Sequence, residues 1–331
     1  MNSSYDALLL ISFGGPETRE DVVPFLENVL RGRNVPRERM LQVAEHYYHF
    51  GGRSPINDQN RALIAAIEAE LAAHGPSLPV YWGNRNWHPF LADALRKMRA
   101  DGVRRALALV TSAFSSYSGC RQYLEDIARA QAEVGASSPQ VDKLRGFYNH
   151  PGFLDAIADR IAAALAEFPE SRSAAAHLLF TAHSIPLSMA QSSPYVEQLK
   201  EACALVAAKL RRETWRLVYQ SRSGAPGQPW LEPDIRDALR ELPPGADAVV
   251  EPIGFLSDHM EVVYDLDTEA RAVAVEHGVN MIRAATVGTH PSFVAMIREL
   301  IEERIHDGGS RPDRCAEGCC PPVARPPAGK A

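Results

Sequence analysis

Short apolar runs alternate along the chain with longer amphipathic segments, and this alternation predicts an α/β fold. The apolar runs, rich in Leu, Val and Ala, span residues 7–13, 79–83, 105–111, 176–182, 216–220, 248–253 and 279–284. The amphipathic segments are rich in residues that favour helices, and they span residues 59–74, 92–100, 123–133, 153–168, 195–212 and 292–306. Strands that alternate with helices of this length are typical of parallel sheets.

Two of the apolar runs are followed by similar loops, which suggests an internal duplication. Residues 106–115 read ALALVTSAFS and residues 177–186 read HLLFTAHSIP, so each run ends in Thr and a small polar loop. Asn149, His150 and Pro151 interrupt the pattern between them and mark a boundary. Because ligands bind outside the carboxyl ends of parallel strands, we expect the chemistry in these loops, between two facing domains.

Charge and composition exclude several classes of partner. The 331 residues carry 35 Lys and Arg against 41 Asp and Glu, and this net charge of −6 gives no reason to expect nucleic acid or an anionic membrane. No stretch approaches the roughly 18 apolar residues of a membrane span. The first residues lack the pattern of a signal peptide. We therefore expect a cytoplasmic protein of two domains.

His183 is the first candidate for chemistry, because it stands in TAHSIP directly after an apolar run. Neutral imidazole can accept a proton or bind a divalent metal near neutral pH. A single histidine is more often structural, and its place at the end of a strand is what favours a functional role.

The second candidate is an acidic segment, residues 257–269, which reads SDHMEVVYDLDTE. Its residues Glu261, Asp265 and Glu269 recur every four positions, so on a helix they form one stripe of carboxylates. Such a stripe is usually a solvated helix face. Here it follows another apolar run and is flanked by Val and Leu, so a path for a divalent cation is the alternative.

Glycine-rich loops provide weaker signals. Gly14 and Gly15 follow the first apolar run and would allow a ligand to approach the backbone closely. Residues 50–57 and 219–230 form further loops of this type. The chain contains no GxGxxG, P-loop, HExxH or GxSxG motif, so dinucleotide binding and several hydrolase classes have no support.

The five cysteines are unexpected in a cytoplasmic chain, where structural disulfides are rare. Three of them, Cys315, Cys319 and Cys320, fall within six residues of a tail that is rich in Gly and Pro. Composition alone predicts disorder for this tail, and only its cysteines argue for structure.

Taken together, these segments closely resemble the ferrochelatase family. The resemblance covers residues 8 to about 300, and the segments are LISFGGPE (10–17), FGGRSPIN (50–57), FTAHSIP (180–186), YQSRSGAPGQPWLEP (219–233) and PIGFLSDHMEVVYDLD (252–267). It implies the chelatase fold, with two similar Rossmann-like, doubly wound α/β domains, residues 1–148 and 149–288, and a porphyrin cleft between them. Residues 289–331 would form a C-terminal helix and a cysteine tail that pack back on the first domain.

The reaction that the resemblance implies is the insertion of Fe²⁺, a substrate, into a porphyrin with loss of two pyrrole protons. By resemblance, His183 and Glu261 are the paired catalytic and metal-binding residues on opposite walls of the cleft. Asp265 and Glu269 match carboxylates that extend outward as further metal ligands. A cleft that bends the porphyrin exposes its nitrogen lone pairs, and one His with one carboxylate can remove protons and release iron again.

Four residues match porphyrin-contacting positions of the family. Ser54 and Tyr123 match contacts in coproporphyrin-type relatives, and Arg31 matches an arginine that binds a propionate. Phe13 stands where some members have an iron-ligating tyrosine, so that role is absent or displaced here. His46 replaces an arginine of some members, which weakens the assignment of a propionate site on that side.

The resemblance also implies a role for the cysteines, as ligands of an iron–sulfur cluster. The segment 118–127, SGCRQYLEDI, and the tail resemble relatives that carry a [2Fe–2S] cluster, which four thiolates hold. Cys315, Cys319 and Cys320 would supply three ligands and Cys120 the fourth, with Cys203 as the alternative fourth ligand. Exposed thiols without a cluster, or a structural zinc, remain open.

The preferred hypothesis is coproporphyrin III ferrochelatase activity in haem biosynthesis. Protoporphyrin IX as substrate is the nearest alternative; coproporphyrin is favoured because it is water-soluble and no membrane anchor is visible. Two further alternatives are cobalt insertion into a corrin precursor and a non-enzymatic module that binds iron or haem. The expected partners are porphyrin, ferrous iron and enzymes of the haem pathway, and the chain is expected to be a monomer.

Overall fold

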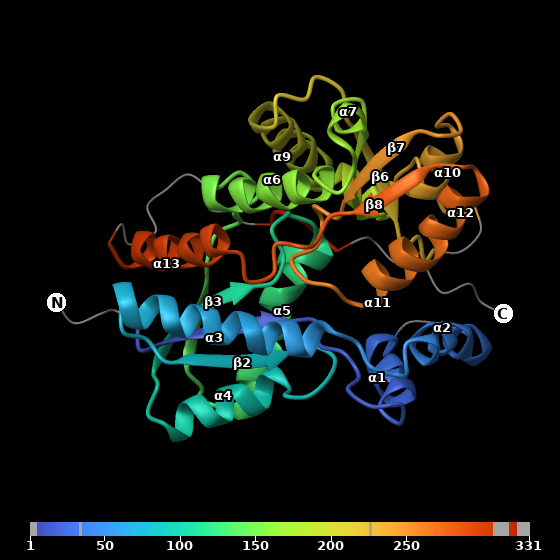
Figure 1. Cartoon of the computed structure of the whole chain (residues 1–331). Coiled ribbons are helices and arrows are strands. Elements are labelled where there is room, and N and C mark those ends of the chain that lie inside the picture. Colours follow the sequence, from blue (N-terminus) through green and yellow to red (C-terminus); the bar gives the residue numbers. More distant parts are fainter. Residues whose placement is uncertain (1–4, 33–34, 225–226, 307–317, 323–331) are drawn as a thin grey trace.

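The computed structural model describes residues 5–32, 35–224, 227–306 and 318–322, and these form two four-stranded parallel sheets (Figure 1). The sheets have the orders β2-β1-β3-β4 and β6-β5-β7-β8, so one arrangement occurs twice. This confirms the predicted fold, and we call the parts built around the two sheets the first and second domain. The strands are β1 (Ala7–Ser12), β2 (Val80–Asn84), β3 (Arg105–Val110), β4 (Gln140–Lys143), β5 (His177–His183), β6 (Arg216–Gln220), β7 (Asp247–Glu251) and β8 (Asn280–Arg283).

Helices cover both faces of each sheet. In the first domain they are α1 (Val22–Val29), α2 (Arg37–His49), α3 (Ile56–His74), α4 (Leu91–Ala100), the π-helix η1 (Tyr117–Arg121) and α5 (Gln122–Val134). The later helices are α6 (Pro151–Leu165), α7 (Glu170–Ser173), α8 (Leu187–Gln191), α9 (Tyr195–Lys209), α10 (Ile235–Arg240), α11 (Met260–Val262), the π-helix η2 (Val263–Ala270), α12 (Arg271–Glu276) and α13 (Pro291–His306).

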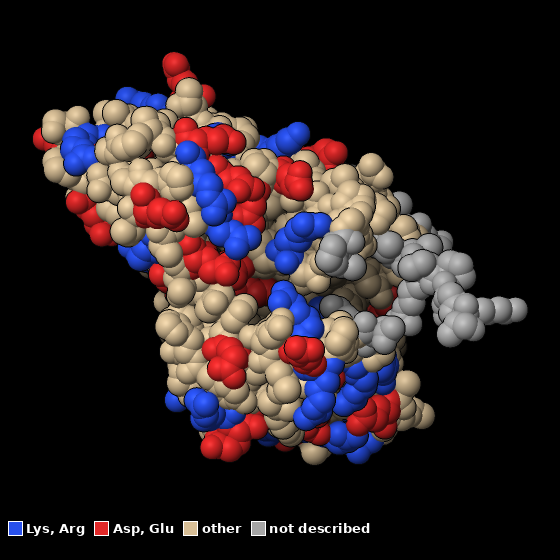
Figure 2. All heavy atoms as spheres, turned by 90° about the vertical axis from the view of Figure 1, so that its right-hand side faces the viewer, with Lys and Arg blue, Asp and Glu red and all other residues tan. Residues whose placement is uncertain are grey.

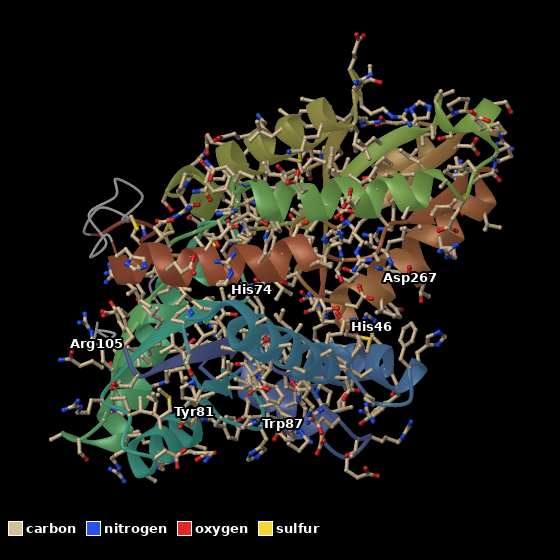
Figure 3. All side chains as sticks on the ribbon, turned by 60° about the vertical axis from the view of Figure 1, so that its left-hand side comes forward. His46, His74, Tyr81, Trp87, Arg105 and Asp267 are labelled. Carbon is tan, nitrogen blue, oxygen red and sulfur yellow. The ribbon has the colours of Figure 1, made fainter. Side chains whose placement is uncertain are left out.

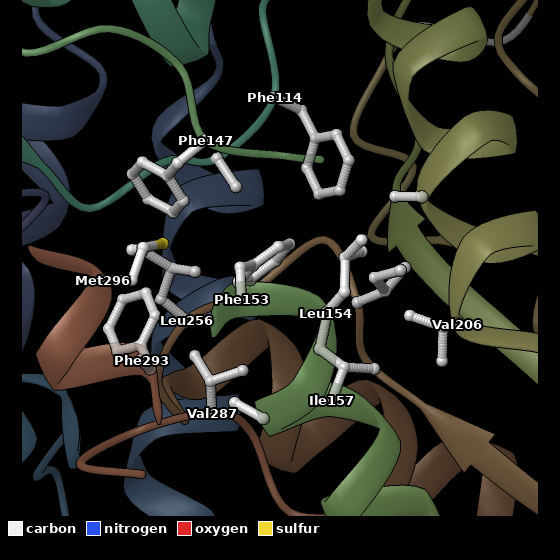
Figure 4. Packing of buried hydrophobic residues seen from close by; sticks show 14 of the residues in the cluster. Phe114, Phe147, Phe153, Leu154, Ile157, Val206, Leu256, Val287, Phe293 and Met296 are labelled. Carbon is white, nitrogen blue, oxygen red and sulfur yellow. The ribbon is translucent and has the colours of Figure 1, made fainter. Parts of the chain in front are cut away.

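One apolar core lies between the two sheets and joins the domains. Phe147, Phe153 and Phe293 meet in it, with ring centroids 5.7–6.3 Å apart, and come from the domain boundary, α6 and α13 (Figure 4). Separate cores lie on the far faces of the two sheets. This double coverage explains why β1 is buried at all six positions and reads as a continuous apolar run.

Helix α13 packs against α3 of the first domain and α6 of the second. Arg298 on α13 pairs with Glu70 on α3, with Nε and Oε1 2.9 Å apart. Arg145, which precedes the domain boundary, pairs with Glu303 at 2.9 Å. The helix expected to pack on the first domain therefore ties both domains together, and the proposed division of the chain at residues 148 and 288 stays a prediction.

The internal duplication exists, but not between the strands that the sequence likeness aligned. The likeness matched β3 with β5, whereas the sheet orders make β1 equivalent to β5 and β3 equivalent to β7. The likeness arises because all of these central strands are buried on both faces and end in a loop on the same edge.

Two further elements differ from the sequence prediction. Strand β4 was not predicted, because its sequence QVDK is short and carries a single apolar residue. The acidic segment, expected as an α-helix, consists of a short α11 followed by the π-helix η2. Single-turn π-helical segments often occur at functional sites. Among the described residues, no helix is both long and apolar enough to cross a membrane.

Candidate active site

His183 is the last residue of β5, and two neighbours hold it in place. The Tyr195 hydroxyl donates a hydrogen bond to the backbone carbonyl of His183 over 3.0 Å. The Nδ1 atom of the imidazole lies 2.5 Å from the carbonyl oxygen of Ser184. A proton on Nδ1 satisfies this contact, so Nε2 is left to face the site.

Glu261 faces that nitrogen from α11. Its Oε2 lies 3.5 Å from Nε2 of His183, and both side chains are partly exposed. The backbone around Glu261 is fixed twice, because its N–H donates to Nδ1 of His259 over 3.2 Å and its carbonyl accepts from the Gln220 amide over 2.6 Å. The structure thus brings together the two residues that the resemblance paired, and it places both on the second domain rather than on opposite walls.

The His183 imidazole responds to two opposing influences. Burial, the larger one, favours the neutral form, whereas the Glu261 carboxylate, the Ser184 carbonyl and the more distant Asp265 favour the charged form. The net result is a pKa of His183 above its ordinary value. A raised pKa makes this imidazole a stronger proton acceptor close to a carboxylate that stabilises the product imidazolium.

Asp265 lies one turn further along, on η2. The Ser221 hydroxyl, which follows β6, donates a hydrogen bond to its Oδ2. Ser221 adopts the left-handed conformation with φ of 62°, which is uncommon for a residue other than Gly. Burial, together with Glu261 and Glu269, raises the pKa of Asp265 to about 7, so this carboxyl changes its charge near neutral pH.

Glu269, the outermost carboxylate of the predicted stripe, is engaged by a cation. Its Oε2 lies 3.1 Å from Nη1 of Arg236 on α10. The three carboxylates therefore follow each other along α11 and η2, and both Glu261 and Glu269 lie close enough to act on Asp265, but Glu269 is ion-paired. Figure 2 shows acidic side chains gathered on the upper, second-domain half of this face, above a hollow between the two halves.

The first domain contributes a group of aromatic side chains, which we call the aromatic wall, within electrostatic reach of the carboxylates. Phe25 on α1 meets Phe13, Tyr47 and Trp87 edge to face, with ring centroids 5.8–6.3 Å apart. Burial and the charges of Glu261 and Asp265 raise the pKa of Tyr47, so this ring lies within the electrostatic reach of the second domain.

One aromatic pair bridges the two domains directly. The His46 imidazole on α2 stacks on the Tyr264 ring of η2, with centroids 3.7 Å apart and planes 7° from parallel. Figure 3 labels His46 on the lower, first-domain side of the boundary and Asp267 of η2 above it. His46 thus packs against the segment that carries the carboxylates.

The four predicted porphyrin contacts lie in different environments. Phe13 is partly exposed, at 38%, and Arg31 is exposed and donates to Asn28. Ser54 is buried at 3% exposure and Tyr123 at 4%. The Arg85 guanidinium lies over both aromatic rings, 4.4 Å from the Tyr123 ring centroid and 5.9 Å from that of Phe13.

The glycine-rich loops pack on protein rather than opening space for a ligand. A Cβ on Gly15 would come within 2.8 Å of Ser54 and Ile56 side-chain atoms. A Cβ on Gly52 would come within 2.5 Å of the Arg19 backbone, and its φ of 83° already favours glycine. These glycines allow the loops at the end of β1 and before α3 to pack against neighbouring segments.

The cysteines separate into two environments. Cys120 lies buried in η1, and it is close enough to Cys320 that its charge, after burial, contributes to raising the pKa of Cys320. Cys319 hydrogen-bonds to Cys320, and Cys315 lies outside the described residues. Cys203 is fully buried in the core on α9. Within residues 5–32, 35–224, 227–306 and 318–322, no three or more His, Cys, Asp or Glu side chains form a group that could hold a metal ion.

Sequence reasoning missed the residues that support the site from other elements. Gln220 ends β6 and Ser221 follows it, and both bind the acidic segment. Arg236 pairs with the outermost carboxylate of that segment. Tyr264 stacks on His46 across the two domains, and Tyr47 lies within electrostatic reach of the second domain. Gln220 and Ser221 stand at the carboxyl end of a strand, which was a usable signal, whereas no local pattern marks the other three.

The chain was compared with known proteins. It matches the ferrochelatase family over residues 5–305. It is 54% identical to a ferrochelatase of Rhodopirellula baltica, over 97% of this chain and 96% of that protein. It is 53% identical to the coproporphyrin III ferrochelatase of Streptomyces griseus, over 98% and 95% of the two chains. Among solved structures, SirB from Bacillus subtilis with Fe³⁺ aligns with a TM-score of 0.58 at 12% identity, over 92% of this chain and 97% of that one. The chain therefore belongs to the ferrochelatase family.

Proposed function

We propose that this protein inserts Fe²⁺ into coproporphyrin III to give Fe-coproporphyrin. The observation that carries the proposal is the His183–Glu261 pair, 3.5 Å apart at the carboxyl end of β5, with Tyr47 of the aromatic wall within electrostatic reach of Glu261. The aromatic wall suits one face of a flat macrocycle. The paired imidazole and carboxylate suit the proton chemistry on the other face.

The reaction releases two protons from the pyrrole nitrogens while the metal takes their place. Neutral His183 accepts a pyrrole proton at Nε2, and the adjacent Glu261 carboxylate stabilises the resulting imidazolium. The Glu261 carboxylate can then take this proton and return it to solvent, after which His183 is neutral again and accepts the second pyrrole proton by the same route. Fe²⁺ approaches along the carboxylates of η2, since oxygen ligands of this type bind it weakly enough to release it.

Coproporphyrin III is favoured over protoporphyrin IX by two considerations. The Streptomyces griseus relative is named for coproporphyrin III, although the Rhodopirellula baltica relative is named only as a ferrochelatase. The exposed Arg31 guanidinium on the first domain is a suitable partner for a porphyrin carboxylate. A porphyrin with four propionates offers more of these groups than one with two.

The experiment compares Fe²⁺ insertion into the two porphyrins by the purified protein under anaerobic conditions. We expect a higher kcat/KM for coproporphyrin III. Faster use of protoporphyrin IX would reverse the substrate assignment, and no insertion into either would favour a binding module.

We also propose that Cys120, Cys315, Cys319 and Cys320 hold a [2Fe–2S] cluster. Three of these residues are described, and the closeness of Cys120, Cys319 and Cys320 fits a shared group. Cys320 has a φ of 51°, a left-handed conformation that lets consecutive thiols turn toward one site. When bound, the cluster would tie the tail to η1 through thiolate ligands, and no step of the metal insertion is assigned to it.

The cluster is tested by visible absorption together with iron and sulfide analysis of anaerobically purified protein. Cys120→Ser should remove the absorption and about two iron atoms per chain, whereas Cys203→Ser, a matched change in the core, should leave both. A colourless, iron-free wild-type protein would contradict the proposal, and zinc in its place would indicate a structural zinc site.

We infer that the protein is a cytoplasmic monomer whose domains divide at residues 148 and 288. It would receive porphyrin and ferrous iron and pass its product to enzymes of the haem pathway. Sedimentation analysis tests the monomer, since a mass of twice 36.3 kDa would contradict it.

A further inference from the structure

Arg236 stands at the outer end of the carboxylate stripe and is fixed by two acidic residues. Its Nε lies 2.8 Å and its Nη2 3.1 Å from the two carboxylate oxygens of Asp234, a bidentate arrangement. Its Nη1 lies 3.1 Å from Oε2 of Glu269. Helix α10, which begins at Ile235, packs against η2. Asp234 therefore holds the Arg236 guanidinium in place beside Glu269, the outermost carboxylate of the stripe.

This positive charge affects how the stripe binds a metal ion. One oxygen of Glu269 faces the guanidinium, so a metal ion that uses Glu269 must displace Arg236 or share the carboxylate with it. A divalent cation is also repelled by a fixed positive charge a few ångströms away, and partial burial makes this repulsion stronger than it would be in water. Asp265, the next carboxylate inward, also feels the charge of Arg236.

The other titratable groups near Glu269 do not replace this cation at neutral pH. His46 lies on the first-domain side, and burial lowers its pKa below the ordinary value, so its imidazole is neutral. Burial and the neighbouring Glu269 raise the pKa of the Tyr264 hydroxyl, which therefore stays protonated. The guanidinium, whose pKa the Asp234 hydrogen bonds raise further, stays charged.

We propose that Arg236 is a positioning residue that competes with the incoming metal for Glu269 and so weakens metal binding at the entrance of the stripe. The inference rests on the proposed function, in which Fe²⁺ travels along these carboxylates. Competition of this kind keeps the entrance from trapping a divalent ion, so that the ion moves inward to Glu261 and His183. An entrance that lacks Arg236 would hold the ion longer.

The test is Arg236→Gln, with Mn²⁺ as a spectroscopic probe of the porphyrin-free protein. Binding measured by electron paramagnetic resonance should tighten by about five- to tenfold, the order expected for removal of one charge close to a partly buried site. Arg240→Gln is the matched control, because Arg240 is on the same helix and pairs instead with Asp237 at 2.8 Å. This control should leave Mn²⁺ affinity unchanged.

Two further variants separate the competition from a structural role. Arg236→Lys keeps a positive charge and should bind Mn²⁺ nearly as weakly as the wild type. In the double variant Arg236→Gln/Glu269→Gln the tighter Mn²⁺ binding should disappear, because the Glu269 carboxylate that Arg236→Gln makes available to the metal is no longer present. Unchanged or weaker Mn²⁺ binding by folded Arg236→Gln would overturn the inference, as would equal tightening by Arg236→Lys.

The outcome is independent of the proposed chemistry at His183. In iron insertion, Arg236→Gln should lower the KM for Fe²⁺ together with kcat, because the ion binds more tightly and moves inward more slowly. If the protein inserts no iron at all, the Mn²⁺ titration still reports whether Arg236 competes for Glu269.

Discussion

The carboxyl edges of the two sheets have the same topology but different chemistry. The edge of the first domain carries Phe13 and the buried Arg85–Asp126 pair, with Nε and Oδ2 2.5 Å apart and each side chain at most 8% exposed. The edge of the second domain carries His183 and, opposite it, the half-exposed Glu261. One arrangement of strands thus supports an aromatic wall with a buried ion pair on one side and a titratable, partly solvated wall on the other.

The difference shows how one fold can use paired charges for structure in one domain and titratable charges for chemistry in the other. Charges on the first wall are paired and removed from water, so they hold side chains in place. Charges on the second wall lie near one another and near solvent, so their pKa values shift and their protons can move. Changes on the first wall should therefore reduce stability, and changes on the second wall should reduce activity.

The largest effect is expected from Arg85→Met. This change leaves the buried Asp126 carboxylate without its buried cation, which should lower the free energy of unfolding by about 3–5 kcal/mol. Arg129→Met is the control, because Arg129 binds the same carboxylate but is 70% exposed, and it should cost less than about 1 kcal/mol. Urea unfolding measures both, and equal effects would remove the contrast between buried and exposed partners.

Glu261→Gln should reduce activity rather than stability. Its side chain is half exposed, so stability should change little, whereas kcat for iron insertion should fall at least about a hundredfold because proton transfer loses its carboxylate. Glu276→Gln, an exposed change on α12, should leave kcat unaltered. Substantial turnover by Glu261→Gln would place the proton chemistry elsewhere.

The pH dependence should follow Asp265, whose pKa burial raises to about 7. Deprotonation as the pH rises through 7 creates a metal ligand, so kcat/KM for Fe²⁺ should rise several-fold between pH 6 and pH 8. Asp265→Asn should flatten this rise, and Asp237→Asn, at a 62% exposed position, should retain it. An unchanged profile in Asp265→Asn would assign the titration to another group.

The same carboxyl has the opposite effect on stability. Because the folded state binds its proton more tightly than the unfolded chain, Asp265 stabilises the protein fully below the ordinary pKa of 3.8, and this contribution is lost as the pH rises through about 7. Urea unfolding at pH 5 and pH 7.5 should show a smaller loss for Asp265→Asn than for the wild type.

The smallest effect is expected where the two walls touch. His46→Ala removes the stack on Tyr264 and should lower the free energy of unfolding by about 1 kcal/mol, with a reduction in kcat of a few-fold. His74→Ala, at a 60% exposed side chain, should change neither quantity. A loss of activity as large as that of Glu261→Gln would give His46 a direct chemical role.

Much of the fold could be predicted from sequence because its strands are buried on both faces. Such strands read as apolar runs, and β1 and β5 were readily recognised. Strand β4 was missed because a short edge strand with one apolar residue carries no periodic signal. The four-residue spacing predicted the carboxylate stripe but not the π-helix, which depends on hydrogen bonding and packing around the segment.

The candidate site was predictable only in part for a similar reason. His183 and Glu261 stand at strand ends in distinctive motifs, so local sequence was sufficient. Arg236 and Tyr47 reach the site from elements that are distant in sequence, and a contact of this kind leaves no local pattern. The resemblance also placed the pair on opposite walls, whereas both residues belong to the second domain, because the segment after β7 folds back toward β5.

We expect the second wall to perform chemistry on a porphyrin that the first wall helps to hold. The most direct measurement is His183→Ala, with coproporphyrin III binding followed by fluorescence and iron insertion followed by absorbance. We expect the variant to bind porphyrin with an affinity within about threefold of the wild type and to insert iron at about one hundredth of the wild-type rate or less. Near-normal insertion by this variant would show that His183 is not the proton acceptor.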